Sequence, residues 1–239
     1  MFSLTCFNLT FTSSRRMFIV TVLFIALFVH LGRWQIERAY EKKQLLDVAH
    51  QQSMLPPILW HAHDTLPKQY QALQLSGYFL PMILLLDNQH HQHQLGYDVI
   101  SPLCLHDGSV VLIDRGWVKA DPQRSILPVL ERPTGHIDVV GTAYYPSSKT
   151  WVLGANLEEV TRDITRVEVL DTPLISQFLH KSVYPFIIRQ NKNDAHGYVR
   201  DWAIVSMPPV RHYGYAVQWF AMALVIFIIF IALNLKKTR

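Results

Sequence analysis

The chain of 239 residues is half apolar, and its length suits one folded domain together with membrane segments. Seven of its 22 lysine and arginine residues lie in terminal stretches that hold no acid, which leaves 15 basic residues against 18 acidic ones in the middle. A slightly acidic middle gives no reason to expect a nucleic-acid partner, and two cysteines are too few for a disulfide framework.

The first apolar stretch runs from Met17 to Leu31 and directly follows two arginines. As a helix it would be about 22 Å long, and the next residues, a glycine, an arginine and Trp34, would complete a membrane span. We therefore predict a loose cytoplasmic tail over residues 1–16 and a first transmembrane helix over residues 17–35. A cleaved signal peptide is the rival interpretation, but no small-x-small cleavage site follows the apolar core.

The second apolar stretch, from Tyr213 to Leu235, carries no charge, and basic residues follow it directly. At about 1.5 Å per residue it is long enough to cross a hydrocarbon core of about 30 Å. We predict a second transmembrane helix over residues 213–235 and a cytoplasmic basic tail over residues 236–239. Because positive charges favour the cytoplasmic side, both termini are expected there.

The segment between the two spans, residues 36–211, is then expected to form a periplasmic domain, or a domain in the intermembrane space of a mitochondrion. The N-terminal tail lacks the long Arg- and Ser-rich character of a transit peptide, so the bacterial inner membrane is favoured over the mitochondrial one.

Two helical segments are expected outside the membrane. The first span continues in a helical pattern to His50 and should end before Pro56 and Pro57. A second, short helix is expected over residues 172–180, with Thr172 as its N-cap and Pro173 at its first position.

The rest of the middle predicts a mostly antiparallel β-rich domain. Loosely alternating apolar residues and turn signals indicate strands, with Asp107 and Gly108 at the tip of a hairpin. The expected extended segments are 70–79, 82–86, 96–105, 109–117, 136–145, 163–170, 184–190 and 198–205. The predicted fold class is thus a membrane α+β protein, in which two transmembrane helices flank one extramembrane domain.

A cluster of histidines, His90, His91 and His93, is a candidate metal site, because imidazole is a good ligand for copper and zinc. A periplasmic copper- or zinc-binding protein is therefore one alternative function. The more favoured interpretation is a polar loop between strands that begins at Asp87 and Asn88, since no partner cysteine or acid lies at a familiar spacing.

Two further patterns carry possible chemistry. Cys104 and His106 share one face of a predicted strand, which would allow a thiolate–imidazole pair, but a small buried cysteine is favoured. Asp114 and Arg115 end an apolar strand, where a solvated or paired strand end is favoured over a site, with Gly116 required by the backbone.

His30 and His212 each lie near the outer mouth of one predicted span. An ionisable residue at membrane depth is costly and is a functional-site hypothesis by default, and neutral imidazole can ligate haem iron. An interfacial role, with the polar tip in the headgroup region, is favoured for His30. For His212 a functional role is favoured, on the grounds of the family resemblance described next.

Several segments together resemble one known family. The exit of the first span, residues 31–38, reads Leu-Gly-Arg-Trp-Gln-Ile-Glu-Arg and is similar to that of the surfeit locus protein 1 family. The turn at residues 77–79, the strands at residues 96–103 and 111–118, and the closing segment at residues 211–220, which reads Arg-His-Tyr-Gly-Tyr-Ala-Val-Gln-Trp-Phe, look like its other signatures. These matches run in order over most of the chain.

The resemblance implies a non-enzymatic assembly factor for haem-copper (cytochrome c) oxidase that assists delivery of haem a to subunit I. The expected partners are subunit I and the haem a synthesis machinery. His212 is the candidate haem ligand, and we expect Tyr213, Trp219 and Trp34 to line the macrocycle and Arg211 to pair with a propionate. A scaffold that holds the oxidase by its helices, without a cofactor, is the other alternative.

Overall fold

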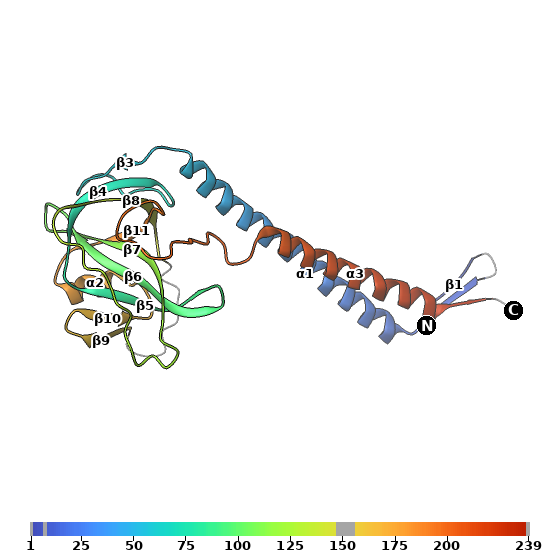
Figure 1. Ribbon diagram of the computed structural model, residues 1–239. Coiled ribbons are helices and arrows are strands. Elements are labelled where there is room, and N and C mark those ends of the chain that lie inside the picture. The colour runs from blue at the N-terminus through green and yellow to red at the C-terminus, as the bar shows by residue number, and fades with distance from the viewer. Residues whose placement is uncertain (1, 7–8, 147–155, 238–239) are drawn as a thin grey trace. The chain divides into compact units, whose positions relative to one another are not determined.

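The computed structural model describes residues 2–6, 9–146 and 156–237. The chain forms two compact units (Figure 1). The first, which we call the helical unit, comprises Met1–Asp47 and Ile204–Arg239. The second, the β domain, comprises Val48–Ala203.

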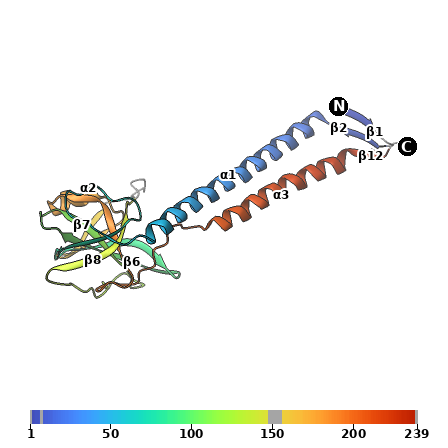
Figure 2. The same ribbon diagram turned by 90° about the horizontal axis from the view of Figure 1, so that it is seen from above.

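Two antiparallel helices, α1 (Arg15–Ser53) and α3 (Pro209–Asn234), lie side by side in the helical unit, as Figures 1 and 2 show. The hydroxyl of Ser14 accepts a hydrogen bond from the Met17 amide at 3.2 Å and so caps the first turn of α1. Helix α3 begins with a proline at its first position, where no amide donor is needed. The prediction that the first helix continues past the apolar stretch without a break is confirmed.

The contact between α1 and α3 follows a seven-residue repeat. Ala216, Ala223 and Phe230 are the buried apolar residues of α3 and recur at this interval. Small residues allow the helices to approach closely: a Cβ atom on Gly32 of α1 would lie 2.7 Å from ring atoms of Phe220. Such a repeat keeps the same face of each helix in contact along its length.

The outward faces of both helices are apolar. Each helix is long and apolar enough to cross a membrane, with a mean hydropathy of 2.0 in α1 and 2.6 in α3 over the most apolar 18 residues. Only 11% of that window in α1 and 17% in α3 is buried, whereas a core helix of a soluble protein would be mostly covered. The two helices are therefore candidate membrane spans.

A small sheet joins the two ends of the chain. Strands β1 (Phe2–Cys6) and β2 (Leu9–Ser13) pair antiparallel, and β12 (Leu235–Lys237) adds to β2. The expectation of a loose N-terminal tail is therefore wrong. The partner strand β12 lies more than 200 residues away in the sequence, so local pattern could not reveal the pairing. Arg239, part of the predicted basic tail, lies outside the described residues.

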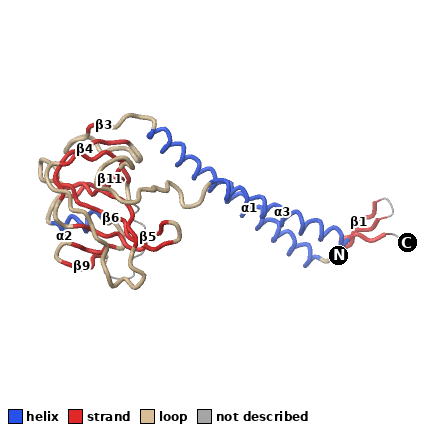
Figure 3. The backbone as a smooth tube through the Cα atoms, in the orientation of Figure 1, coloured by secondary structure: helices blue, strands red, loops and turns tan. Residues whose placement is uncertain are grey.

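The β domain contains a sheet of nine strands (Figure 3). Strands β4, β8, β11, β7 and β6 are hydrogen-bonded in that order, and a pairing of β4 with β6 closes them into a barrel-like ring. The prediction of a mostly antiparallel domain is confirmed: parallel pairing occurs only between β3 and β4, β5 and β10, and β7 and β11 among the described strands. The strands are β3 (Ile58–Leu59), β4 (Ala72–Phe79), β5 (Ile83–His91), β6 (Gln94–Cys104), β7 (Val110–Lys119), β8 (Ile137–Tyr144), β9 (Leu157–Thr161), β10 (Ile164–Val167) and β11 (Val183–Gln190).

Alternate residues of these strands fill the inside of the ring. Buried side chains at i and i+2 in β4, β7 and β11 meet there, and Trp60 adds its ring to the same cluster. The outer face of β5, β6 and β7 packs against α2 (Thr172–Leu179) through Ile175. A segment after β7 adds Leu127 and Leu130 to a third cluster. Burial on both sides explains why β7 reads as a nearly continuous apolar run.

Several sequence predictions for this domain need correction. The turn does not begin at Asp87 and Asn88, because β5 runs on to His91 and the turn lies at Gln92 and His93, which have φ angles of 49° and 63°. The cap of α2 is Asp171 rather than Thr172: its carboxylate accepts from the Leu174 amide at 3.1 Å. Residues 198–205 form no strand and contribute one bridge between Val199 and Trp117. Strands β3 and β9 were not predicted.

A cluster of two acidic residues and one basic residue lies on the outer face of the barrel-like ring of strands. Asp114 of β7 is a register partner of Arg189 of β11, and Asp98 lies on β6 beside them. No nitrogen of Arg189 is within 4 Å of a carboxylate oxygen in the part of the chain that the structure describes; its guanidinium stacks 3.6 Å from the ring centre of Tyr144 and 5.4 Å from that of Trp202. One buried carboxyl group, that of Asp114, and one half-buried one, that of Asp98, thus lie near a single cation.

Burial raises the pKa of Asp98 to about 6, against a smaller lowering by Arg189. Burial also raises the pKa of Asp114 well above its usual value, the nearby Asp98 adds to the rise, and Arg189 opposes it. A carboxyl whose pKa is higher in the folded than in the unfolded chain stabilises the fold most below pH 3.8, and the stability is lost as the pH rises through the folded pKa.

We therefore expect the thermal stability of the β domain to fall between pH 4 and pH 8. The rise of the Asp98 pKa corresponds to at most about 3 kcal/mol of this loss. Asp114→Asn keeps an oxygen that can accept from the Gly116 amide but removes the buried charge, so it should raise the melting temperature at pH 8 and flatten the pH dependence. Calorimetry of the full chain across this range measures both effects.

The matched control is Asp138→Asn, because that aspartate is exposed. This variant should follow the wild-type pH curve. A melting temperature of Asp114→Asn that declines with pH as steeply as that of the wild type would contradict the explanation.

Candidate functional site

The candidate site lies where α1 and α3 exchange a polar contact. Nδ1 of His212, in the first turn of α3, lies 2.8 Å from Oε1 of Gln35 in α1. Both side chains are partly buried on the faces that the helices turn toward each other. The pair comes from two segments, residues 31–38 and 211–220, that the sequence analysis singled out separately.

This contact determines which ring nitrogen of His212 carries the lone pair. An amide oxygen only accepts hydrogen bonds, so the imidazole donates from Nδ1–H and the lone pair is on Nε2. Nε2 is buried and has no hydrogen-bond partner among the described residues. An oriented imidazole with a free Nε2 lone pair is the form that ligates a metal ion or haem iron.

Aromatic rings lie along the same helix contact. The ring centroids of Trp219 and Phe28 are 5.6 Å apart, and both residues lie seven positions from the His212–Gln35 pair on their own helices. Beside them, Phe220 covers Gly32. The polar pair therefore has apolar aromatic neighbours two turns away along the same helix contact.

The structure places the other predicted site residues apart from this contact. Arg211 and Tyr213 flank His212 in the sequence but are exposed. Trp34 is 43% exposed, and the Arg38 guanidinium lies 5.7 Å from its ring centre. Of the five residues predicted to bind a cofactor, His212 and Trp219 contact α1, while Arg211, Tyr213 and Trp34 present free surface.

The remaining histidines do not converge. His30 is exposed on α1. His90 approaches the Asn88 carbonyl, His91 packs 5.3 Å from the Trp117 ring, and His93 lies in the turn. Within residues 2–6, 9–146 and 156–237, no group of three or more His, Cys, Asp or Glu side chains is placed to hold a metal ion. The copper or zinc alternative therefore gains no support from the geometry and stays a prediction.

The structure also shows the surroundings of the candidate site residues in the β domain. Cys104 ends β6, is partly buried and directs its thiol toward the Leu105 carbonyl at 3.7 Å. Asp114 and Arg115 are not a solvated strand end, because both are buried and β7 runs on to Lys119; they point to opposite faces of the strand. Gly116 does require its backbone freedom, with φ at 113°.

The sequence analysis missed Gln35 as a site residue. Gln35 lies within the span-exit segment, but nothing in the local sequence shows which residue faces His212. A signal was present: Phe28 and Gln35 are seven apart, as are His212 and Trp219, and antiparallel helices with a seven-residue repeat pair such positions.

Comparison with known proteins covers this same region. A model of the SURF1 family matches residues 22–224, which include Gln35 and His212. A SURF1-like protein of Rickettsia felis is 26% identical over 222 residues, 89% of this chain and 94% of the relative. One of Rickettsia conorii is 26% identical over 90% of this chain and 89% of the relative, and one of Rickettsia bellii is 28% identical over 63% and 73%.

The family match extends over most of the chain and includes both halves of the polar helix contact. The surfeit locus protein 1 resemblance noted in the sequence is therefore confirmed, and the chain belongs to the SURF1 family, a family of assembly factors linked to cytochrome c oxidase.

Proposed function

We propose that this protein is a non-enzymatic assembly factor that holds haem a through His212 and assists its delivery to subunit I of cytochrome c oxidase. The observation that carries the proposal is the oriented imidazole of His212, whose Nδ1 meets Gln35 at 2.8 Å and whose Nε2 has no partner among the described residues. Family membership supports the link to the oxidase.

The residues present suit such a cofactor. Haem a, when bound, supplies an iron centre that accepts a nitrogen ligand, and Nε2 of His212 is the nitrogen offered. Gln35 orients the ring and raises the basicity of Nε2, as outer partners of ligating histidines do. The exposed aromatic rings of Tyr213 and Trp34 would contact a flat apolar macrocycle, and the exposed Arg211 would pair with a propionate.

The proposed setting is the bacterial inner membrane. The apolar outer faces of α1 and α3 support two spans, and the basic residues beside Met17 and after Asn234 support cytoplasmic termini. The β domain would then lie in the periplasm, where it would meet subunit I and the haem a synthesis machinery. The relatives of Rickettsia species agree with a bacterial origin.

The first test is the absorption spectrum of the full chain, purified in detergent from cells that make haem a. We expect a Soret band in the wild type and at least about a tenfold loss of haem occupancy in His212→Ala, because a ligand bond cannot be replaced by a methyl group. His30→Ala is the matched control, since it removes an exposed histidine from α1.

Absence of a band in the wild type, despite a supply of haem a, would favour the cofactor-free scaffold instead. Restoration of oxidase activity by His212→Ala in a strain that lacks this protein would lead to the same conclusion, because a scaffold does not need the imidazole.

The second test concerns Gln35. Gln35→Leu leaves Nδ1–H without an acceptor and frees the ring to rotate, so haem affinity should fall about 10- to 100-fold. Gln35→Glu keeps an acceptor oxygen and should retain most of the affinity. Haem titration followed by absorbance measures both variants, and Gln44→Leu, on the exposed face of α1, is the control. Equal affinity of Gln35→Leu and wild type would remove Gln35 from the site.

A further inference from the structure

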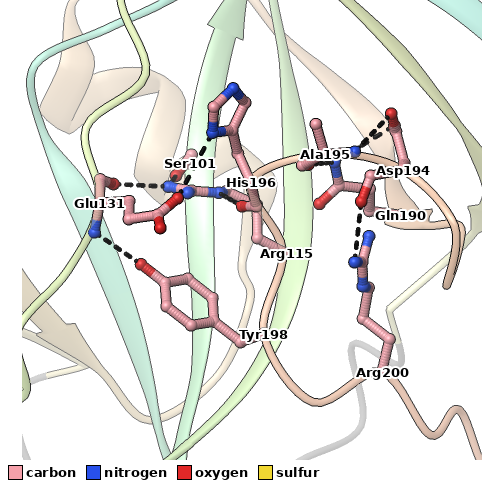
Figure 4. Close-up of polar contacts among 9 residues, drawn as sticks. All are labelled: Ser101, Arg115, Glu131, Gln190, Asp194, Ala195, His196, Tyr198 and Arg200. Atoms are coloured by element: carbon pink, nitrogen blue, oxygen red, sulfur yellow. Dashed lines mark hydrogen bonds and ion pairs between the residues drawn. The ribbon is translucent and has the colours of Figure 1, made fainter.

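Arg115 is a buried cation with an unusual set of partners. It lies on β7 and is 1% exposed, and its side chain points to the inner face of the barrel-like sheet. Its Nε donates to the His196 carbonyl at 2.8 Å, and its Nη1 donates to the Glu131 carbonyl at 2.9 Å and to the Ser101 hydroxyl at 3.2 Å (Figure 4). All three acceptors are neutral.

No carboxylate neutralises this guanidinium at close range. Arg115 forms no ion pair within 4 Å in the described part of the chain, and the Glu131 carboxylate approaches the His196 ring at 3.4 Å instead. The carboxylate side chain of Glu131 is also 67% exposed, so water screens its charge. The rings of Tyr198 and Phe79 lie 5.2 and 5.6 Å from the guanidinium carbon, and the Tyr198 hydroxyl, which accepts from the Glu131 amide, is a further polar neighbour.

One donor of Arg115 is left over. Nη2 is buried and has no hydrogen-bond partner among the described residues. Burial lowers the pKa of Arg115; the nearby Tyr198 hydroxyl and Glu131 carboxylate oppose part of this change, and the charge of Arg200 adds to it. Removing a cation from water without a counter-ion is unfavourable, so an anion would be attracted to this point.

Arg115 forms part of the wall of a cavity of about 350 Å³, which is within the usual size range of small-molecule sites. The wall is mostly apolar and includes Phe79, Leu80 and Pro81. Arg132 stands at the rim, 45% exposed and 2.7 Å from the Asp163 carboxylate. The cavity therefore combines an apolar wall, a hydroxyl from Ser101 and a buried positive charge.

We propose that this cavity binds a small monocarboxylate with an apolar body, with the carboxylate paired to Arg115 and the body against Phe79 and its apolar neighbours. A cation would be repelled by Arg115, and a neutral ligand would leave its charge uncompensated. A phosphate would satisfy the guanidinium but not the apolar wall. The site lies in the β domain and is separate from His212.

The test uses the full chain in lipid nanodiscs, with 4-phenylbutyrate as the probe and isothermal titration calorimetry as the readout. We expect 4-phenylbutyrate to bind at least about tenfold more tightly than its primary amide, because only the acid offers a charge-assisted partner for Arg115. Inorganic phosphate at equal concentration should displace little of the probe.

Two variants address the pocket from different sides. Arg115→Gln should abolish the preference for the acid over the amide. The Arg115 side chain also holds the segments at Glu131 and His196 through their carbonyl groups, so a second variant is needed. Thr134→Trp fills the cavity from an exposed position and should abolish binding while Arg115 stays in place. Arg124→Gln, which breaks an ion pair to Asp87 elsewhere in the domain, should bind normally.

Three results would each overturn the proposal. The first is the absence of any heat of binding at probe concentrations of about 10 mM. The second is equal affinity for the acid and the amide, and the third is unchanged binding of the probe to Thr134→Trp. Loss of haem binding in His212→Ala would leave all of these measurements unaffected, so the two proposals can fail independently.

Discussion

A polar side chain between two apolar helices must find a partner, and the pair formed by His212 and Gln35 meets this requirement across the helix contact. The consequence is directional. Because Gln35 occupies Nδ1, the orphaned nitrogen is Nε2, which is the one that a ligated metal would use. Small residues and rings on the same seam, such as Gly32 under Phe220, keep the helices close enough for a hydrogen bond of 2.8 Å. Helix packing and the orientation of the imidazole thus depend on one contact.

The β domain distributes its buried charges by strand alternation. On β7, Asp114 points to the outer face, where it meets Asp98 and Arg189, and Arg115 points toward the inside of the ring. The outer cluster has one more carboxyl than cation, and burial together with the nearby Asp98 raises the pKa of Asp114. The inner side has a cation whose hydrogen-bond acceptors are all neutral. Neighbouring residues of one strand therefore lie in opposite charge environments. Gly116, with φ at 113°, follows them within β7, where the register with β6 shifts between Asp98 and Ile100.

Much of the fold was accessible from the sequence, because its signals are local. The apolar helices, the strands with alternating residues and the hairpin at Asp107 and Gly108 could all be read from neighbouring residues. The predictions that failed concern residues whose partners are distant in the sequence. Strands β1 and β2 form a sheet with β12. Arg115 is buried because segments near Glu131 and His196 cover it. His212 was identified through a family resemblance, while Gln35 needed the helix register. The N-cap of α2 was predicted one position too late, because Asp171 and Thr172 are adjacent and both residue types are good caps.

The terminal sheet has a mechanical consequence for the helix pair. Strand β2 precedes α1 and strand β12 follows α3, so the main-chain pairing of Leu235 with Phe11 ties the far ends of the two helices together. A sliding motion of one helix along the other would shift this pairing, and a shift by one residue would turn every side chain of β12 to the opposite face. The sheet thus acts as a register lock. Any opening of the His212–Gln35 contact is then confined to rotation of side chains or splaying of the helices, rather than shear between them.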